Sequence, residues 1–297
     1  MSSQVTAAKI RKPPTGGLWK QAFTRLFRMP RAVVCFSIIA LLVCVSLLSA
    51  LGVPFTPYGF DQTSPQILLG PSPEHWMGTD ELGRDLLTRI IYGARLSIAI
   101  GVTIAGMAFL IGTTYGSIAG FYGGRIDSIM MRGVDLAYAL PDLLVMILIG
   151  VLVGRGTVGI LLSLGLVSWM GTARLVRAQL LQLQSEEFID AARAAGRGTF
   201  DIIAKHMLPN AMGPIIVALT FTVPSAILSE STLSFIGLGL SPPACSWGTL
   251  ASDGWRSLRT HPHLILFPSI FIFMTVLSFN QLGDGLRDAL DPRTRKR

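Results

Sequence analysis

Long stretches without a charged side chain dominate this sequence and limit the structures that it can form. No Asp, Glu, Lys or Arg occurs from residue 32 to residue 60, and a first membrane span fits at about 32–53. Each of these stretches is near or above the length that crosses the hydrocarbon core of a bilayer as a helix. The sequence therefore predicts an all-α, polytopic membrane protein with six transmembrane helices. The other five spans are expected at 96–120, 134–153, 156–173, 211–236 and 264–283.

The composition supports this class and argues against several others. Hydrophobic residues make up 51% of the chain and charged residues only 14%, where soluble domains usually carry about a quarter. The pI near 9.9 is explained by basic loops at the membrane surface, so no nucleic acid partner is expected. The three cysteines form neither a disulfide framework nor a metal-binding spacing, and there is no CxxC, no HExxH and no Gly-Lys pair. We therefore expect no metal site and no Walker A nucleotide-binding loop in this chain, and no catalysis by it.

The distribution of basic residues predicts the orientation. With the N-terminus placed inside, 19 of the 25 Lys and Arg residues fall in cytoplasmic segments and six in outer ones, so both termini should be cytoplasmic. The expected divisions are a cytoplasmic tail (1–31), a first transmembrane helix (32–53), an extracytoplasmic segment (54–95), a core of five helices (96–285) with a cytoplasmic loop at 185–210, and a cytoplasmic tail (286–297).

That loop, EEFIDAARAAGRGTFDIIAKHMLPNA, is polar between two apolar spans. We predict a helix capped by Ser185, a left-handed turn at Gly196, and a second helix capped by Thr199 and ended by Pro209. Helical spacing would place Phe200, Ile203 and Met207 on one face of the second helix. The pattern alone fits a helical pair exposed to a partner or an amphipathic loop lying on the lipid surface.

The segment DAARAAGRGTFDIIAKHMLP resembles the EAA loop of ABC importer permeases, with Asp190 at the position of its Glu. His206 stands where that family prefers an aliphatic residue. The resemblance implies the type I ABC importer permease fold, in which this loop is the coupling helix that fits a cleft on an ATPase subunit. The coupling residues implied are Glu187, Asp190, Ala191, Ala192, Gly196, Phe200, Leu208 and Pro209.

Three further segments, at 78–97, 232–250 and 282–297, resemble the second permease of bacterial peptide and nickel importers. In the second of them, Ser246 replaces the acid of a usual Glu-Trp-Gly and Cys245 replaces a common proline. In the first, we expect Asp80 to cap a helix, with Glu81–Arg84 and Asp85–Arg89 spaced for surface ion pairs. The third is expected to end its helix at Asp291-Pro292.

The resemblance implies a subunit of the bacterial cytoplasmic membrane that passes di- or oligopeptides and is not itself an enzyme. Its partners would be a homologous second permease, two ABC ATPase subunits, an extracytoplasmic solute-binding protein and membrane lipid. ATP and Mg²⁺ would be bound by the ATPase subunits, and this chain would hold no cofactor. A nickel chelate or another small solute is the alternative cargo. A secondary transporter, the alternative of another class, would show more spans and internal repeats.

Several acidic residues and histidines inside or beside the spans need an explanation. Glu230 lies within the fifth span, and because a charge in lipid is costly it should face the translocation cavity or a partner helix. The alternative is a solvated position near the outer interface. Asp135 and Asp142 are expected to bind backbone groups or to pair with Arg132, and the histidines of the His-Pro-His segment at 261–263 to be solvated.

Overall fold

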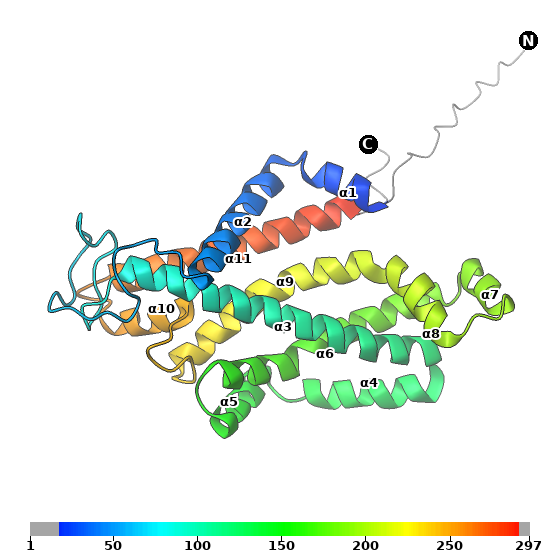
Figure 1. Ribbon diagram of the computed structural model, residues 1–297. Coiled ribbons are helices and arrows are strands. Elements are labelled where there is room, and N and C mark those ends of the chain that lie inside the picture. The colour runs from blue at the N-terminus through cyan, green and yellow to red at the C-terminus, as the bar shows by residue number, and fades with distance from the viewer. Residues whose placement is uncertain (1–17, 291–297) are drawn as a thin grey trace, which may run out of the picture.

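The computed structural model describes residues 18–290, and these form a bundle of long helices with two loop-rich ends (Figure 1). Residues 1–17 and 291–297 lie outside the described part, and so does the predicted helix stop at Asp291-Pro292. The elements are α1 (Leu18–Leu26), α2 (Pro30–Ala50), α3 (Leu86–Tyr122), α4 (Gly124–Tyr138), α5 (Asp142–Val153), α6 (Thr157–Leu183), α7 (Glu187–Ala194), α8 (Thr199–Ile202), a π-helical turn (Ile203–Met207), α9 (Leu208–Phe235), α10 (Trp247–Arg256) and α11 (His263–Leu290).

The predicted spans correspond to helices of the bundle. Five continuous helical segments in the described residues are long and apolar enough to cross a membrane: α2, α3, α6, the run from α8 to α9, and α11. The pair α4 and α5 makes a sixth if it is counted as one broken span, with a bend of 81° between its halves. The all-α membrane fold is thus confirmed, and α3, α6 and α11 extend beyond the uncharged stretches.

The third span differs from the prediction. Helix α4 begins ten residues before position 134, and the chain breaks where Pro141 takes an extended conformation (φ −60°, ψ 121°) in front of α5. A proline disfavours helical backbone at the residue before it and lacks an N–H of its own. The break therefore separates two helices instead of kinking one.

Closely spaced glycines let the two central helices approach each other. Gly112, Gly116 and Gly120 recur every four residues on α3 and face α6. A β-carbon on Gly116 would lie only 2.4 Å from the carbonyl oxygen of Ala173. Small residues at this spacing allow backbones to pack without a layer of side chains, as is common in membrane helices.

The two ends of the bundle differ in structure (Figure 1). One end carries α7 and α8, with α1 and the C-terminal end of α11 toward the same side. The other end carries α10 and the loop of residues 51–85. These are called here the α7 end and the α10 end.

Candidate functional site

The predicted loop forms a short helical hairpin at the α7 end. Helix α7 ends in a turn at Gly196, whose φ is +72°. The N–H of Gly196 donates to the carbonyl of Arg193, and the N–H of Arg197 donates to that of Ala192. These two bonds form a Schellman motif, which requires the left-handed backbone that glycine adopts without steric cost. The predicted turn is confirmed.

The inner face of the hairpin is packed on the membrane helices. Ile189, Ile202 and Met207 are fully or almost fully buried. They form one apolar cluster with residues from the ends of two long helices, namely Val176 and Leu180 of α6 and Ala211 and Ile215 of α9. The hairpin is therefore close-packed against the ends of α6 and α9.

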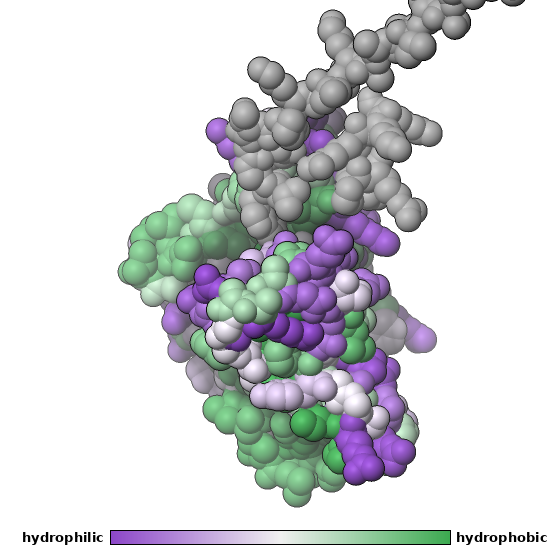
Figure 2. Space-filling view, turned by 90° about the vertical axis from the view of Figure 1, so that its right-hand side faces the viewer, coloured by the Kyte–Doolittle hydropathy of each residue, from purple (hydrophilic) through white to green (hydrophobic). Residues whose placement is uncertain are grey.

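The outer face of the hairpin is exposed on the surface of the described part of the chain. Phe200 is 82% exposed, and Phe188, Asp190 and Ala191 are exposed beside it. Within residues 18–290, the ion pair that Asp190 makes is a surface contact with Arg193 at 3.4 Å. Viewed onto this end, the surface is mainly hydrophilic, whereas its flanks are hydrophobic (Figure 2). An exposed aromatic ring on a polar, water-facing surface is typical of a site for a soluble partner.

The predicted caps of the two short helices are wrong. Glu186, not Ser185, occupies the N-cap of α7, and the hydroxyl of Ser185 donates to the carbonyl of Gln182 in the preceding helix. Gly198, not Thr199, occupies the N-cap of α8. Serine and threonine hydroxyls often bond carbonyls of the turn before them, which removes them as caps.

The predicted end of the second helix is also wrong. Pro209 is the second residue of α9 and continues the helical run. Proline is tolerated in a first helical turn, and the π-helical turn of Ile203–Met207 lies directly before it. The wider turn also changes the helical phase. Phe200 therefore points outward while Met207 is buried, instead of sharing a face with it.

One predicted coupling residue faces inward. Ala192 is only 7% exposed and belongs to the buried cluster, whereas Ala191 is exposed. A large side chain at position 192 would disturb the packing of the hairpin itself. The remaining predicted positions, Glu187, Asp190, Ala191, Gly196, Phe200 and Pro209, are exposed, and Leu208 is half-buried.

Glu230 lies inside the subunit and not on a face of the bundle. Its side chain is 0% exposed, and its carboxylate accepts hydrogen bonds from Ser234 at 2.8 Å and from Ser246 at 2.6 Å. The backbone of Gly248 lies against its other oxygen. The expected translocation cavity at Glu230 is therefore wrong, and so is the alternative of a solvated position, whereas the expected contact with another helix is found. Glu230 joins α9 to α10, and Ser246, which replaces the expected acid, is one of its donors.

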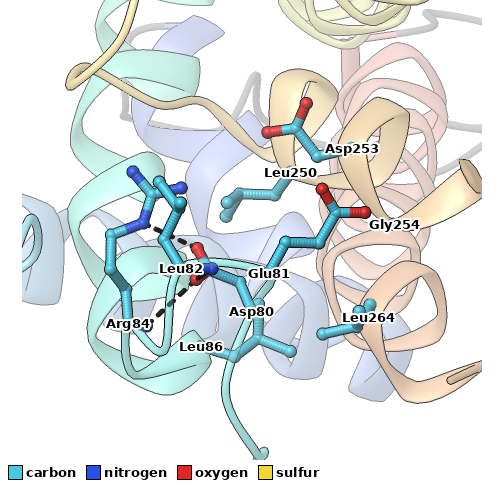
Figure 3. Close-up of a pocket in the computed structure, with 9 residues that line it drawn as sticks. All are labelled: Asp80, Glu81, Leu82, Arg84, Leu86, Leu250, Asp253, Gly254 and Leu264. Carbon is cyan, nitrogen blue, oxygen red and sulfur yellow. Dashed lines mark hydrogen bonds and ion pairs between the residues drawn. The ribbon is translucent and has the colours of Figure 1, made fainter. Parts of the chain in front are cut away.

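The α10 end is organised by a second acidic centre (Figure 3). The carboxylate of Asp80 binds Arg84 at 2.7 Å and Arg89 at 2.6 Å, while Asp85 caps α3 through the N–H of Thr88. The predicted cap at Asp80 and the predicted pairs Glu81–Arg84 and Asp85–Arg89 are wrong. Asp80 and Arg84 border a cavity of about 200 Å³, which is also lined by Glu81, Leu82, Leu86, Leu250, Asp253, Gly254 and Leu264.

The predicted pairing of Asp135 is also wrong, and a second ion pair beside it was not predicted. Asp135 does not pair with Arg132; it binds Arg174 of α6 at 2.6 Å. Asp127 of α4 binds Arg177, one helical turn further along α6. Both pairs connect helices some 40 to 50 residues apart in the sequence, so helical spacing within one segment does not reveal them. His261 bonds the neighbouring Thr260, and His263 is half-buried.

Cys245 provides a test of the packing at the α10 end. Its thiol is fully buried, and burial raises its pKa to about 11, from an ordinary value near 9. The thiolate is the reactive form, so at pH 8 this raised pKa lowers the thiolate population about a hundredfold. We expect a maleimide to leave Cys245 unmodified in the folded protein and to modify it after denaturation. The control is an introduced thiol, Thr260→Cys, at an exposed position in the loop between α10 and α11. Modification of Cys245 at equal rates in the folded and denatured states would contradict this packing.

Two protein families match most of the sequence. Residues 112–296 match the family described as the binding-protein-dependent transport system inner membrane component. Residues 17–71 match the N-terminal TM domain of oligopeptide transport permease C. Together these matches include α1 to α11 except for the stretch between 72 and 111.

Curated relatives match over most of the chain. The oligopeptide transport system permease protein OppC of Bacillus subtilis (strain 168) is 44% identical over 294 residues, covering 98% of this chain and 94% of that protein. The dipeptide transport system permease protein DppC of the same organism is 52% identical over 229 residues, covering 77% and 72%. OppC of Escherichia coli (strain K12) is 42% identical over 282 residues, covering 94% and 92%.

A solved structure shares the fold. A chain of the MetNI methionine ABC transporter, in an inward-facing conformation, superposes with a TM-score of 0.56 at 19% identity. The match covers 68% of this chain and 96% of that one. With spans, hairpin and family matches in agreement over nearly its whole length, this chain belongs to the family of inner membrane components of binding-protein-dependent transport systems, as a multi-pass permease subunit.

Proposed function

We propose that this chain is the permease subunit of a peptide importer and passes di- or oligopeptides across the cytoplasmic membrane. The observation that carries the proposal is the match to permeases named for oligopeptide and dipeptide transport, at 44% identity over 98% of the chain in one case. The chain would act with a homologous second permease, two ABC ATPase subunits and an extracytoplasmic solute-binding protein. ATP and Mg²⁺ would be bound by the ATPase subunits, and this subunit would catalyse no reaction.

The proposed orientation places the α7 end in the cytoplasm, with both termini on that side. It is supported by the 19 of 25 basic residues that fall on cytoplasmic segments under this assignment. The α10 end would then face the solute-binding protein.

In this proposal the hairpin of α7 and α8 docks on the ATPase subunit through its outer face. Phe200 and Ala191 supply an apolar contact, and Asp190 supplies a charge at the edge. When ATP binding moves the ATPase subunits, the hairpin moves with them. Its buried cluster with α6 and α9 then transmits the motion to the helices at the centre of the bundle.

The proposal is tested by reconstituting the complete complex in proteoliposomes with its binding protein. ATP-dependent uptake is measured for a series from dipeptides to pentapeptides, with nickel chelates and single amino acids as comparison solutes. A complex whose ATPase subunits cannot hydrolyse ATP serves as the control. We expect uptake of at least one peptide length only with active ATPase. If the complex imports a nickel chelate or a single amino acid but none of the peptides, peptide is not its cargo.

A further inference from the structure

A polar cavity lies in the middle of the helix bundle, remote from both loop-rich ends. It measures about 200 Å³ and is bordered by α3, the α4–α5 break, α6 and α9. Its lining includes Ile104, Leu164 and Ala226, which come from the central parts of their helices. Six polar side chains also line it: Tyr138, Asp142, Ser168, Thr222, Ser225 and Ser229. At this depth a membrane helix normally presents apolar side chains, so such a lining indicates a path for polar solutes.

Three of the hydroxyls lie on one face of α9. Thr222, Ser225 and Ser229 follow each other at intervals of three and four residues, which places them along one side of a helix. The opposite side of α9 holds Val223, Ile227 and Glu230, which are buried. One side of α9 is thus packed inside the subunit, and the other side bears hydroxyl groups and borders the cavity. This is the same helix that the buried cluster connects to the hairpin of α7 and α8.

Asp142 brings a charge to this cavity. It is the first residue of α5, directly after the extended Pro141, and its side chain is exposed. Among the described residues no hydrogen bond or ion pair to its carboxylate is found, whereas the nearby Asp135 is held by Arg174. Arg174 also stacks on the ring of Tyr138, at 4.0 Å from its centroid. The neighbouring charges therefore pair with each other, and the carboxylate of Asp142 is left to the cavity.

An unpaired carboxylate in a membrane span is costly unless water or a ligand reaches it. The N-terminal turn of a helix lowers that cost, because its dipole favours negative charge. A cationic group that enters the cavity would be attracted by the carboxylate, and the hydroxyls can donate and accept hydrogen bonds with amide groups. A peptide with a free N-terminus offers both an ammonium and amides.

We propose that this cavity is the contribution of this subunit to the cargo path, with Asp142 attracting the α-ammonium of a passing peptide and the α9 hydroxyls bonding its amides. The inference rests on the proposed peptide transport but concerns particular side chains. It also revises the expectation that Asp142 binds only backbone or Arg132.

The charge of the cavity can be tested without any transport. In a complex whose Cys35 and Cys44 are replaced with alanine, Ser225→Cys introduces a thiol into the cavity, while the buried Cys245 stays. Its rate of modification is measured with a cationic trimethylammonium-ethyl methanethiosulfonate and with the anionic sulfonatoethyl reagent. We expect the cationic reagent to react faster than the anionic one. Asp142→Asn should lower the ratio of the cationic to the anionic rate at least about fivefold, since the nearby negative charge is removed. Asp142→Glu should keep the ratio. Thr232→Cys, exposed on α9 outside the cavity, should be little affected by Asp142→Asn.

A second measurement connects the cavity to cargo. A saturating tripeptide with its binding protein and ATP should slow modification of Ser225→Cys, and Asp142→Asn should lower uptake about tenfold relative to Asp142→Glu. Retained assembly of each variant is checked by co-purification of all subunits. Equal reagent ratios in the parent and in Asp142→Asn, or unchanged peptide uptake by Asp142→Asn, would overturn the inference. If the parent complex imports no peptide while the charge preference is present, the proposed cargo fails and the electrostatic character of the cavity stands.

Discussion

Replacing Gly196 with valine is expected to lower coupled peptide uptake about tenfold. The turn has φ +72°, where an L-residue is penalised by about 1–2 kcal/mol and a β-branched residue most of all. The turn is held by the two hydrogen bonds of the Schellman motif, each worth about 0.5–1.5 kcal/mol. The penalty is thus comparable to the free energy that these two hydrogen bonds contribute to the turn. Helix α8, which carries Phe200, should therefore leave its position. A β-carbon at this position meets open space, so no clash contributes.

Gly198 offers a matched control two residues further on. It also has open space for a β-carbon, but its φ is −70° and its ψ 157°, which valine adopts readily. Both variants are reconstituted, and peptide uptake is compared with ATP hydrolysis at equal protein. Gly198→Val should transport nearly like the parent, and Gly196→Val should hydrolyse ATP without matching uptake or lose its ATPase subunits. Equal uptake by the two variants would show that the left-handed turn has no part in coupling.

Replacing Glu230 with leucine is expected to impair folding and assembly, and not only transport. The side chain is fully buried and accepts hydrogen bonds from Ser234 and Ser246. Leucine would remove the acceptor, and each hydroxyl left without one costs about 1–3 kcal/mol. Ser246 is also the N-cap of α10, so the orientation of α10 on the bundle should be disturbed.

Glutamine is the matched replacement, because it keeps the shape and a carbonyl oxygen where the carboxylate accepts both bonds. We expect Glu230→Gln to assemble like the parent and Glu230→Leu to give less folded protein in detergent, measured by size-exclusion chromatography and by thermal unfolding. Normal assembly and stability of Glu230→Leu together with lost uptake would instead place Glu230 in the transport step.

The spans and the Gly196 turn were predictable from local sequence, whereas the caps of the short helices and the contacts between helices were not. The spans follow from uncharged length, and the turn at Gly196 follows from a glycine after an alanine-rich helix. The outward direction of Phe200 depends on the π-helical turn after it, which has no such signal. Ala192 and Ala191 are equivalent by composition, and only packing on α6 and α9 separates them.

The charged residues show the same division. Glu230 could be recognised as a residue that needs partners, but one of them, Ser246, lies 16 residues away in another helix. The carboxylate of Asp80 accepts a hydrogen bond from Arg89, nine residues away, because the chain folds back before α3 begins. The position of Asp142 at a cavity could not be predicted, because helices that are distant in sequence form that cavity.

The docking role of the hairpin is tested most directly by the affinity of the ATPase subunit for the permease pair. Phe200 is 82% exposed in this chain, so its replacement should leave the fold unchanged, and a buried aromatic anchor in an interface is often worth 2 kcal/mol or more. Titration of labelled ATPase onto permeases in nanodiscs should therefore show about thirtyfold weaker binding for Phe200→Ala. Phe200→Tyr, which keeps the ring, should bind nearly like the parent. Equal affinity of the parent and Phe200→Ala would contradict docking through this face.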